Sequence, residues 1–143
     1  MLKNRWFLYL AAYFLWAVSL ALALWLLLVA RNTLPPLLAS LIDPRHAGQM
    51  NIFIDRAFVL LGGSAWLVLM TVLEHHYRKG AEGGQLWVRV GRVTGVLLVL
   101  LFVFDSIQEI REGIPPLGLT WIVLLAELVA GAVLLYLSRR RPA

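Results

Sequence analysis

Three charged residues lie within apolar stretches of the C-terminal half of the sequence. Arg92 and Asp105 bracket one uncharged stretch, and Glu127 lies in the middle of another, residues 117–137. At about 1.5 Å per helical residue, Arg92 and Asp105 would be roughly 20 Å apart, less than the hydrocarbon core of about 30 Å. A charge in lipid is costly unless it is paired, neutral or facing water or protein. These residues therefore indicate an intramembrane ion pair or a relay for protons or cations.

We expect Arg92 and Glu127 to form this intramembrane charge pair. If residues 86–107 and 117–138 form a helical hairpin, their depths differ by roughly 7 Å, within the combined reach of both side chains. Asp55 and Asp105 would then be acids near the outer mouth. The pair could fix only the helix register, or Glu127 could meet a partner subunit or carry protons.

The elements that would position these charges are four long apolar segments. The chain has 143 residues, of which 61% are hydrophobic, and its mean hydropathy is +0.80. Soluble domains are about 45–50% apolar, and a membrane-spanning helix needs about 20 apolar residues. We predict an all-α, polytopic integral membrane protein, a single domain over residues 1–143. It would be an antiparallel bundle of four transmembrane helices, at about residues 6–30, 52–77, 86–107 and 117–138.

Two prolines predict where the first helix ends. Pro35 and Pro36 cannot donate backbone hydrogen bonds, and each restricts the residue before it. We therefore expect residues 31–51 to form an outer loop with a short interfacial helix at 37–42. Asp43, His46 and Asp55 could meet there as metal ligands, but their spacing does not require it, and we predict no metal site.

A second short outer helix is expected after the third span. Ser106 and Glu109 have the spacing of a capping box, which typically marks the start of a helix. The N-terminal apolar run, residues 6–30, is longer than the 7–15 residues usual in a signal peptide, so we expect it to be retained as the first span.

The basic residues predict the topology. By these boundaries one side of the membrane carries Lys3, Arg5, Arg78, Lys79, Arg89, Arg92, Arg139, Arg140 and Arg141, and the other carries Arg31, Arg45, Arg56 and Arg111. Because basic residues are enriched on the cytoplasmic side, both termini should be cytoplasmic, in the inner or plasma membrane of a prokaryote. The net charge of +5 then reflects topology and contact with anionic lipid, and we expect no nucleic-acid partner.

Charged and histidine side chains cluster at the predicted cytoplasmic ends of the second and third helices. They form a predicted lipid-contact patch of His75, His76, Arg78, Lys79 and Arg89. Adjacent histidines point about 100° apart on a helix, so His75 and His76 cannot both bind one ion. Glu74 and Arg78 have the spacing of an ion pair. The alternatives are a solvated helix end and, with less support, a lipid-modifying enzyme that uses the two histidines.

Small residues predict close helix packing at Gly62, Gly63, Ser64 and Gly131. In lipid, such residues let backbones approach because helices associate through packing. Ser64 could also be a nucleophile, but His75 would lie about 16 Å further along the same helix. We therefore reject a hydrolase at this position unless His46 folds inward from the outer loop.

Motifs of enzymes and of cofactor binding are absent from the sequence. It has no cysteine, which excludes disulfides, iron–sulfur clusters and thiol redox chemistry. We expect no catalytic residue and no cofactor, although apolar surface could bind a lipid, quinone or pigment. The loops between spans are too short for a soluble domain. We therefore predict a non-catalytic membrane subunit that packs with other integral membrane subunits in the lipid bilayer. The alternative is a small self-oligomer that conducts ions or protons through Glu127.

Overall fold

The computed structural model describes residues 3–42, 45–113 and 118–140, and these residues are almost entirely helical. The helices are α1 (Lys3–Ile42), α2 (Ala47–Glu82), α3 (Leu86–Glu112) and α4 (Leu119–Arg140). All four are long and apolar enough to cross a membrane. The prediction of an all-helical fold with four candidate membrane spans is therefore confirmed.

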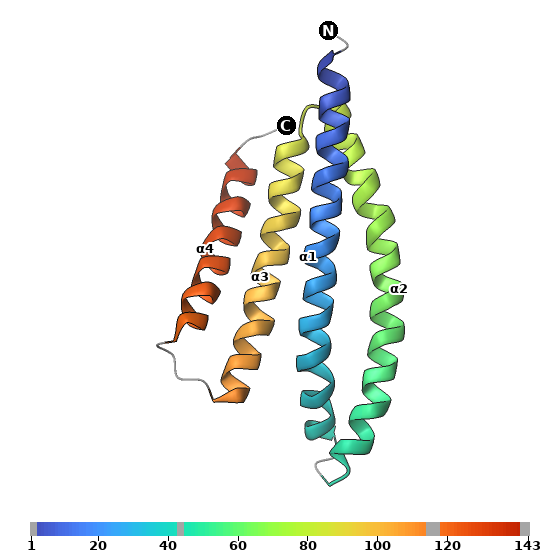
Figure 1. The fold of residues 1–143 in the computed structure, drawn as a ribbon, viewed down its shortest axis with the longest axis vertical. Helices are drawn as coiled ribbons and strands as arrows, with labels where there is room; N and C mark the ends of the chain where they lie inside the picture. Colours follow the sequence, from blue (N-terminus) through green and yellow to red (C-terminus); the bar gives the residue numbers. More distant parts are fainter. Residues whose placement is uncertain (1–2, 43–44, 114–117, 141–143) are drawn as a thin grey trace.

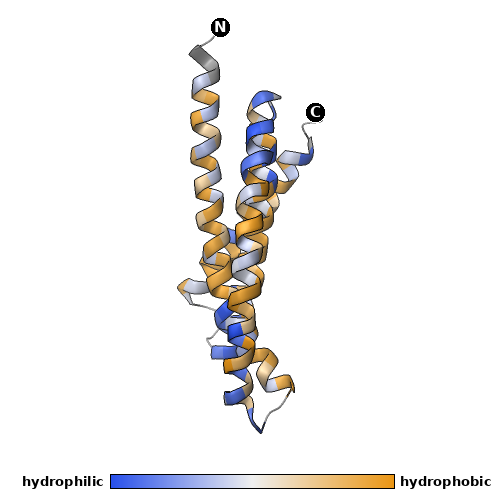
Figure 2. Ribbon diagram, turned by 90° about the vertical axis from the view of Figure 1, so that its right-hand side faces the viewer, coloured by the Kyte–Doolittle hydropathy of each residue, from blue (hydrophilic) through white to orange (hydrophobic). Residues whose placement is uncertain are grey.

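The four helices form an open arrangement. Figure 1 shows that consecutive helices run in opposite directions, so α1 begins and α4 ends at the same end of the molecule. Helices α1, α2 and α3 pack against one another, whereas α4 contacts α3 alone among the described helices. Figure 2 shows hydrophilic residues gathered mostly toward the two ends of the molecule. The fold is thus a three-helix cluster with α4 on its flank.

The first helix continues through both prolines. Pro35 and Pro36 lie inside α1, so the predicted loop over residues 31–51 is wrong, and α2 already begins at Ala47. Pro35, Thr33 and Ala39 are almost completely buried, and Thr33 Oγ1 donates to the carbonyl of Val29 at 2.9 Å. A proline in a helix interior costs about 3 kcal/mol. Burial of this segment offsets that cost, which a local sequence rule does not include.

The third helix also extends beyond its predicted end. It ends at Glu112, followed by Gly113 in the left-handed conformation at φ 69° and ψ 25°, with its N–H bonded to the carbonyls of Glu109 and Ile110. Within the described residues, Ser106 Oγ and Glu109 Oε2 have no hydrogen-bond partner. A capping box needs free backbone N–H groups, and inside a continuous helix these are already bonded. The predicted start of a new helix at Ser106 is therefore wrong.

The tightest part of the core lies where α1 begins and α2 ends. Tyr77 of α2 is 1% exposed and packs with Ala12, Ala81 and Leu86. Its hydroxyl is 2.7 Å from Ser19 Oγ of α1. The shared hydrogen bond satisfies both buried hydroxyl groups, which would otherwise be costly in an apolar environment.

Two glycines bring α3 and α4 into close contact. A Cβ atom on Gly95 would lie 3.0 Å from the carbonyl oxygen of Gly131, and a Cβ on Gly131 would lie 3.0 Å from that of Gly95. Each glycine therefore makes room for the backbone of the other helix. This contact holds α4 against α3 by packing, the main source of association between helices in lipid.

Candidate functional site

The carboxyl group of Glu127 lies at the contact between α3 and α4. Glu127 precedes Gly131 by one helical turn, so both residues lie on the face of α4 that packs against α3. The side chain is half-buried, and its Oε2 atom is enclosed without a hydrogen-bond partner among the described residues. The structure thus places an unsatisfied polar atom inside an apolar span.

The predicted pair between Arg92 and Glu127 is not formed in the described part of the chain, because Glu127 Oε2 has no partner. At 100° per residue, Arg92 and Asp105 lie about 140° apart around α3. Arg92 lines a cavity with Arg89 and Arg139 instead of meeting Glu127. The prediction considered depth and omitted the direction in which each side chain leaves the helix.

Asp105 of α3 and Glu127 of α4 are two half-buried carboxyl groups on neighbouring helices. Neither has an ion-pair partner among the described residues. A charged carboxylate inside an apolar span is costly, and such groups often lie on the pathways of protons or cations. Each of these groups could take up and release a proton, which is the chemistry that a relay requires.

Asp55 is engaged elsewhere. Its carboxylate accepts two hydrogen bonds from the guanidinium of Arg31, Nε to Oδ1 at 2.7 Å and Nη2 to Oδ2 at 2.9 Å. This bidentate contact links α1 and α2. The two acids expected at one outer mouth, Asp55 and Asp105, are therefore not joined by a contact in the described residues.

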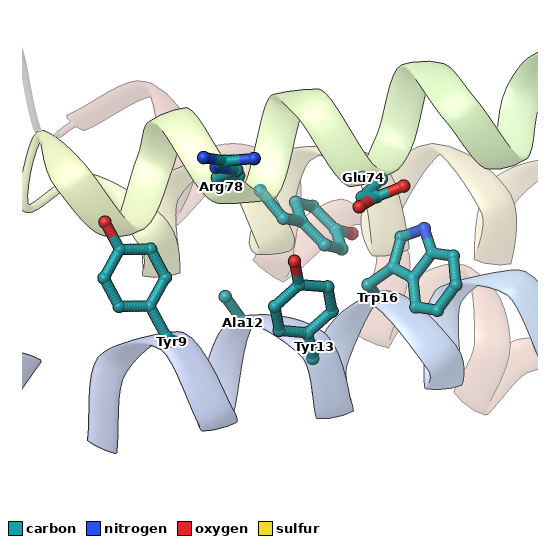
Figure 3. A pocket seen from close by; sticks show the side chains of 7 residues that line it. Tyr9, Ala12, Tyr13, Trp16, Glu74 and Arg78 are labelled. Carbon is teal, nitrogen blue, oxygen red and sulfur yellow. The ribbon is translucent and has the colours of Figure 1, made fainter. Parts of the chain in front are cut away.

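The predicted lipid-contact patch is divided between two sides of α2. Figure 3 shows Arg78 and Glu74 facing Tyr9, Tyr13 and Trp16 of α1. Arg78 lies 3.6 Å from Glu82, and the expected pair with Glu74 is not formed among the described residues. His75 and Lys79 are exposed.

Arg89 belongs to α3 and contacts the side of α2 that faces away from residues 9–16 of α1. Its Nη1 donates to the carbonyl of His76 at 2.9 Å. It shares a cavity with Arg92 and Arg139, neither of which was predicted in the patch. The i, i+3 spacing of Arg89 and Arg92 places them on similar faces of α3, and an antiparallel α3–α4 hairpin brings Arg139 beside them. Those two signals could have identified this group.

The predicted packing residues also face different ways. A Cβ on Gly62 would lie 2.7 Å from Leu27 Cδ1 of α1, and Gly131 abuts α3. In contrast, a Cβ on Gly63 would meet nothing within 4 Å, and Ser64 is exposed, donating to the carbonyl of Leu60 at 2.8 Å. Gly95 was not predicted, although its four-residue spacing from Gly91 is typical of close helix packing.

Comparison with protein-family models, curated proteins and solved structures finds no match to this chain. The function of the chain is therefore inferred from the arrangement of its own residues.

Proposed function

We propose that the chain is a non-catalytic integral membrane subunit that packs with other membrane proteins as an assembly or stabilising component. The observation that supports this most strongly is the open arrangement of the helices. Helix α4 contacts α3 alone among the described helices, and the chain buries only 6% of the most apolar stretch of α2. Large apolar helix surfaces of this kind are available to helices of other membrane proteins as well as to lipid.

An apolar groove between α1, α2 and α3 is the best place for a partner helix. Its volume is about 410 Å³, and small residues among its lining, Ala23, Ala30, Gly62 and Ala65, allow close approach. Trp66 lines the same groove, and its Nε1–H lacks an acceptor among the described residues. A partner helix with small residues on its facing side would pack into the groove against these positions.

The test is affinity purification of the tagged chain from membranes in a mild detergent, followed by quantitative mass spectrometry. We expect other integral membrane proteins to be recovered in stoichiometric amounts. Ala65→Leu should reduce their recovery because it fills the groove. Ala21→Leu makes the same change at an exposed position of α1 outside the groove and should leave the recovery of partner proteins unchanged. Recovery of the chain alone, or equal loss with both variants, would contradict the proposal.

The location of Glu127 supports a second candidate, a small oligomer that conducts protons or cations through this residue. Its carboxyl group lies inside an apolar helix, and its Oε2 atom is enclosed without a hydrogen-bond partner among the described residues. Such acids are frequent in ion and proton pathways. In this case the groups that complete the pathway would come from other copies of the chain.

Proteoliposome flux measurements separate the two candidates. Conduction requires that Glu127→Gln and Asp105→Asn abolish a proton or cation flux, while Glu112→Gln, at the exposed end of α3, leaves it intact. A subunit without transport activity shows no flux with any of these proteins. Glu127→Gln should then leave the recovery of partner proteins unchanged, because it retains the shape of the side chain.

A further inference from the structure

A cavity with strong positive charge is lined by residues of α2, α3 and α4 and of the connection between α2 and α3. It has a volume of about 680 Å³, and its cationic side chains are Arg89, Arg92 and Arg139. Among the described residues, no acidic side chain lines the cavity, whose lining also includes His76, Gln85 and Ser138. The positive charge of the cavity is therefore not neutralised by the residues that form it.

One of the three arginines is held in place by the fold. Arg89 is half-buried, and its Nη1 donates to the carbonyl of His76 at 2.9 Å. Gly80 makes room for this side chain, since a Cβ there would lie 2.9 Å from Arg89 Cδ. Arg92 and Arg139 are exposed. The cavity thus combines one positioned guanidinium with two that can move to meet a ligand, an arrangement suited to phosphate oxygens.

The start of α3 adds to the attraction for anions. Helix α3 begins at Leu86, and the side chain of Gln85 at its N-cap makes no capping hydrogen bond. Gln85, Trp87 and Val88 all line the cavity. The N-terminal turn of a long helix carries partial positive charge, which reinforces that of the arginines.

An apolar groove continues from the cavity between α3 and α4. It has a volume of about 200 Å³ and includes Gly91, Leu134 and Leu137. Trp87, Val88 and Ser138 line both the groove and the cavity, so the two spaces are adjacent. A Cβ on Gly91 would lie 3.6 Å from the carbonyl of Leu134, so the absence of a side chain there keeps the groove open.

We propose that the cavity and groove together bind one anionic phospholipid. The arginines bind the phosphate of the headgroup, and part of one acyl chain lies in the groove between α3 and α4. A free phosphate would share the headgroup chemistry, but it would leave the groove empty. This inference does not depend on whether the chain joins other subunits.

Native mass spectrometry of the full chain in detergent tests the headgroup contacts, with phosphatidylglycerol and phosphatidylcholine as probes. We expect phosphatidylglycerol to bind more tightly. Arg92→Gln combined with Arg139→Gln should weaken it about 25-fold, about fivefold for each arginine. Both positions are exposed, so the double variant should fold. Arg78→Gln, on α2 outside the cavity, is the control and should bind normally. Equal binding of the two lipids, or no effect of the double variant, would overturn the proposal.

A second pair of variants tests the acyl groove. Leu137→Trp should fill it from its exposed side and weaken phosphatidylglycerol binding severalfold. Leu125→Trp makes the same change at a similarly exposed position of α4 outside the groove and should have no effect. If Leu137→Trp binds like the wild type, or if millimolar inorganic phosphate displaces the lipid completely, the site is one for soluble phosphate and the lipid assignment is wrong.

Discussion

Replacing Gly131 with alanine should weaken the attachment of α4, because Gly131 lies at the closest described approach of α4 to α3. A Cβ at this position would lie 2.9 Å from Val99 Cγ2, 3.0 Å from the carbonyl oxygen of Gly95 and 3.3 Å from Leu98 Cβ. The last two atoms belong to or adjoin the α3 backbone, so they cannot move without moving the helix. Among the described residues, no helix other than α3 contacts α4, so a weakened α3–α4 contact is not compensated elsewhere.

The expected magnitude follows from two opposing effects. Inserting a methyl group into a packed contact costs about 1–3 kcal/mol. Alanine is favoured over glycine in a helix interior by about 1 kcal/mol. Gly131→Ala should therefore lower the free energy of unfolding by up to about 2 kcal/mol. Gly63→Ala provides a matched control, since a Cβ there would meet nothing within 4 Å and only the helix preference would change.

The assay is equilibrium unfolding by sodium dodecyl sulfate in mixed micelles, followed by tryptophan fluorescence of the six tryptophans. The difference between the Gly131→Ala and Gly63→Ala variants isolates the contact and should be about 1–3 kcal/mol. If Gly131→Ala were as stable as Gly63→Ala, α3 and α4 would not be in the close contact described above.

Three further predictions concern the other contacts of the helix cluster. Tyr77→Phe should lower the free energy of unfolding by about 1–3 kcal/mol, because buried Ser19 then loses its hydrogen bond to the Tyr77 hydroxyl. Tyr13→Phe, at an exposed position, should be neutral in the same assay. Pro36→Ala should stabilise the protein more than Pro35→Ala. Both substitutions restore a helix hydrogen bond, but only Pro35 is fully buried, so only its replacement leaves a cavity. Equal effects on the unfolding free energy would argue against this packing. Asp55→Asn should speed hydrogen exchange near the Arg31 contact and have no further effect in an Arg31→Gln background; additive effects would show that the two residues do not interact.

Hydrophobicity was sufficient to predict the four spans, because a spanning helix needs only a long apolar segment. It was insufficient at Pro35, where burial within the tertiary structure offsets the loss of backbone hydrogen bonds. The same limitation applies at Ser106, where a local capping pattern lies within a continuous helix. Local rules predict where a helix can end, but packing decides whether it does.

The candidate site was less predictable than the fold. Depth alone favoured Arg92 as the partner of Glu127, but the direction in which Arg92 leaves α3 places it in the basic cavity. The side-chain direction depends on which face of α3 packs against α4. That face is defined by Gly95 and Gly131, and their contact can be identified only after the register of the two helices is known.

The most direct test of the proposed role as a membrane subunit is photo-crosslinking in native membranes. A photoreactive amino acid replaces Ala65 in the groove or Ala21 on the exposed side of α1. We predict that the Ala65 position crosslinks to one discrete membrane protein and that the Ala21 position does not. Crosslinks only to lipid at Ala65, or the same products from both positions, would contradict the assignment of this groove to a partner subunit.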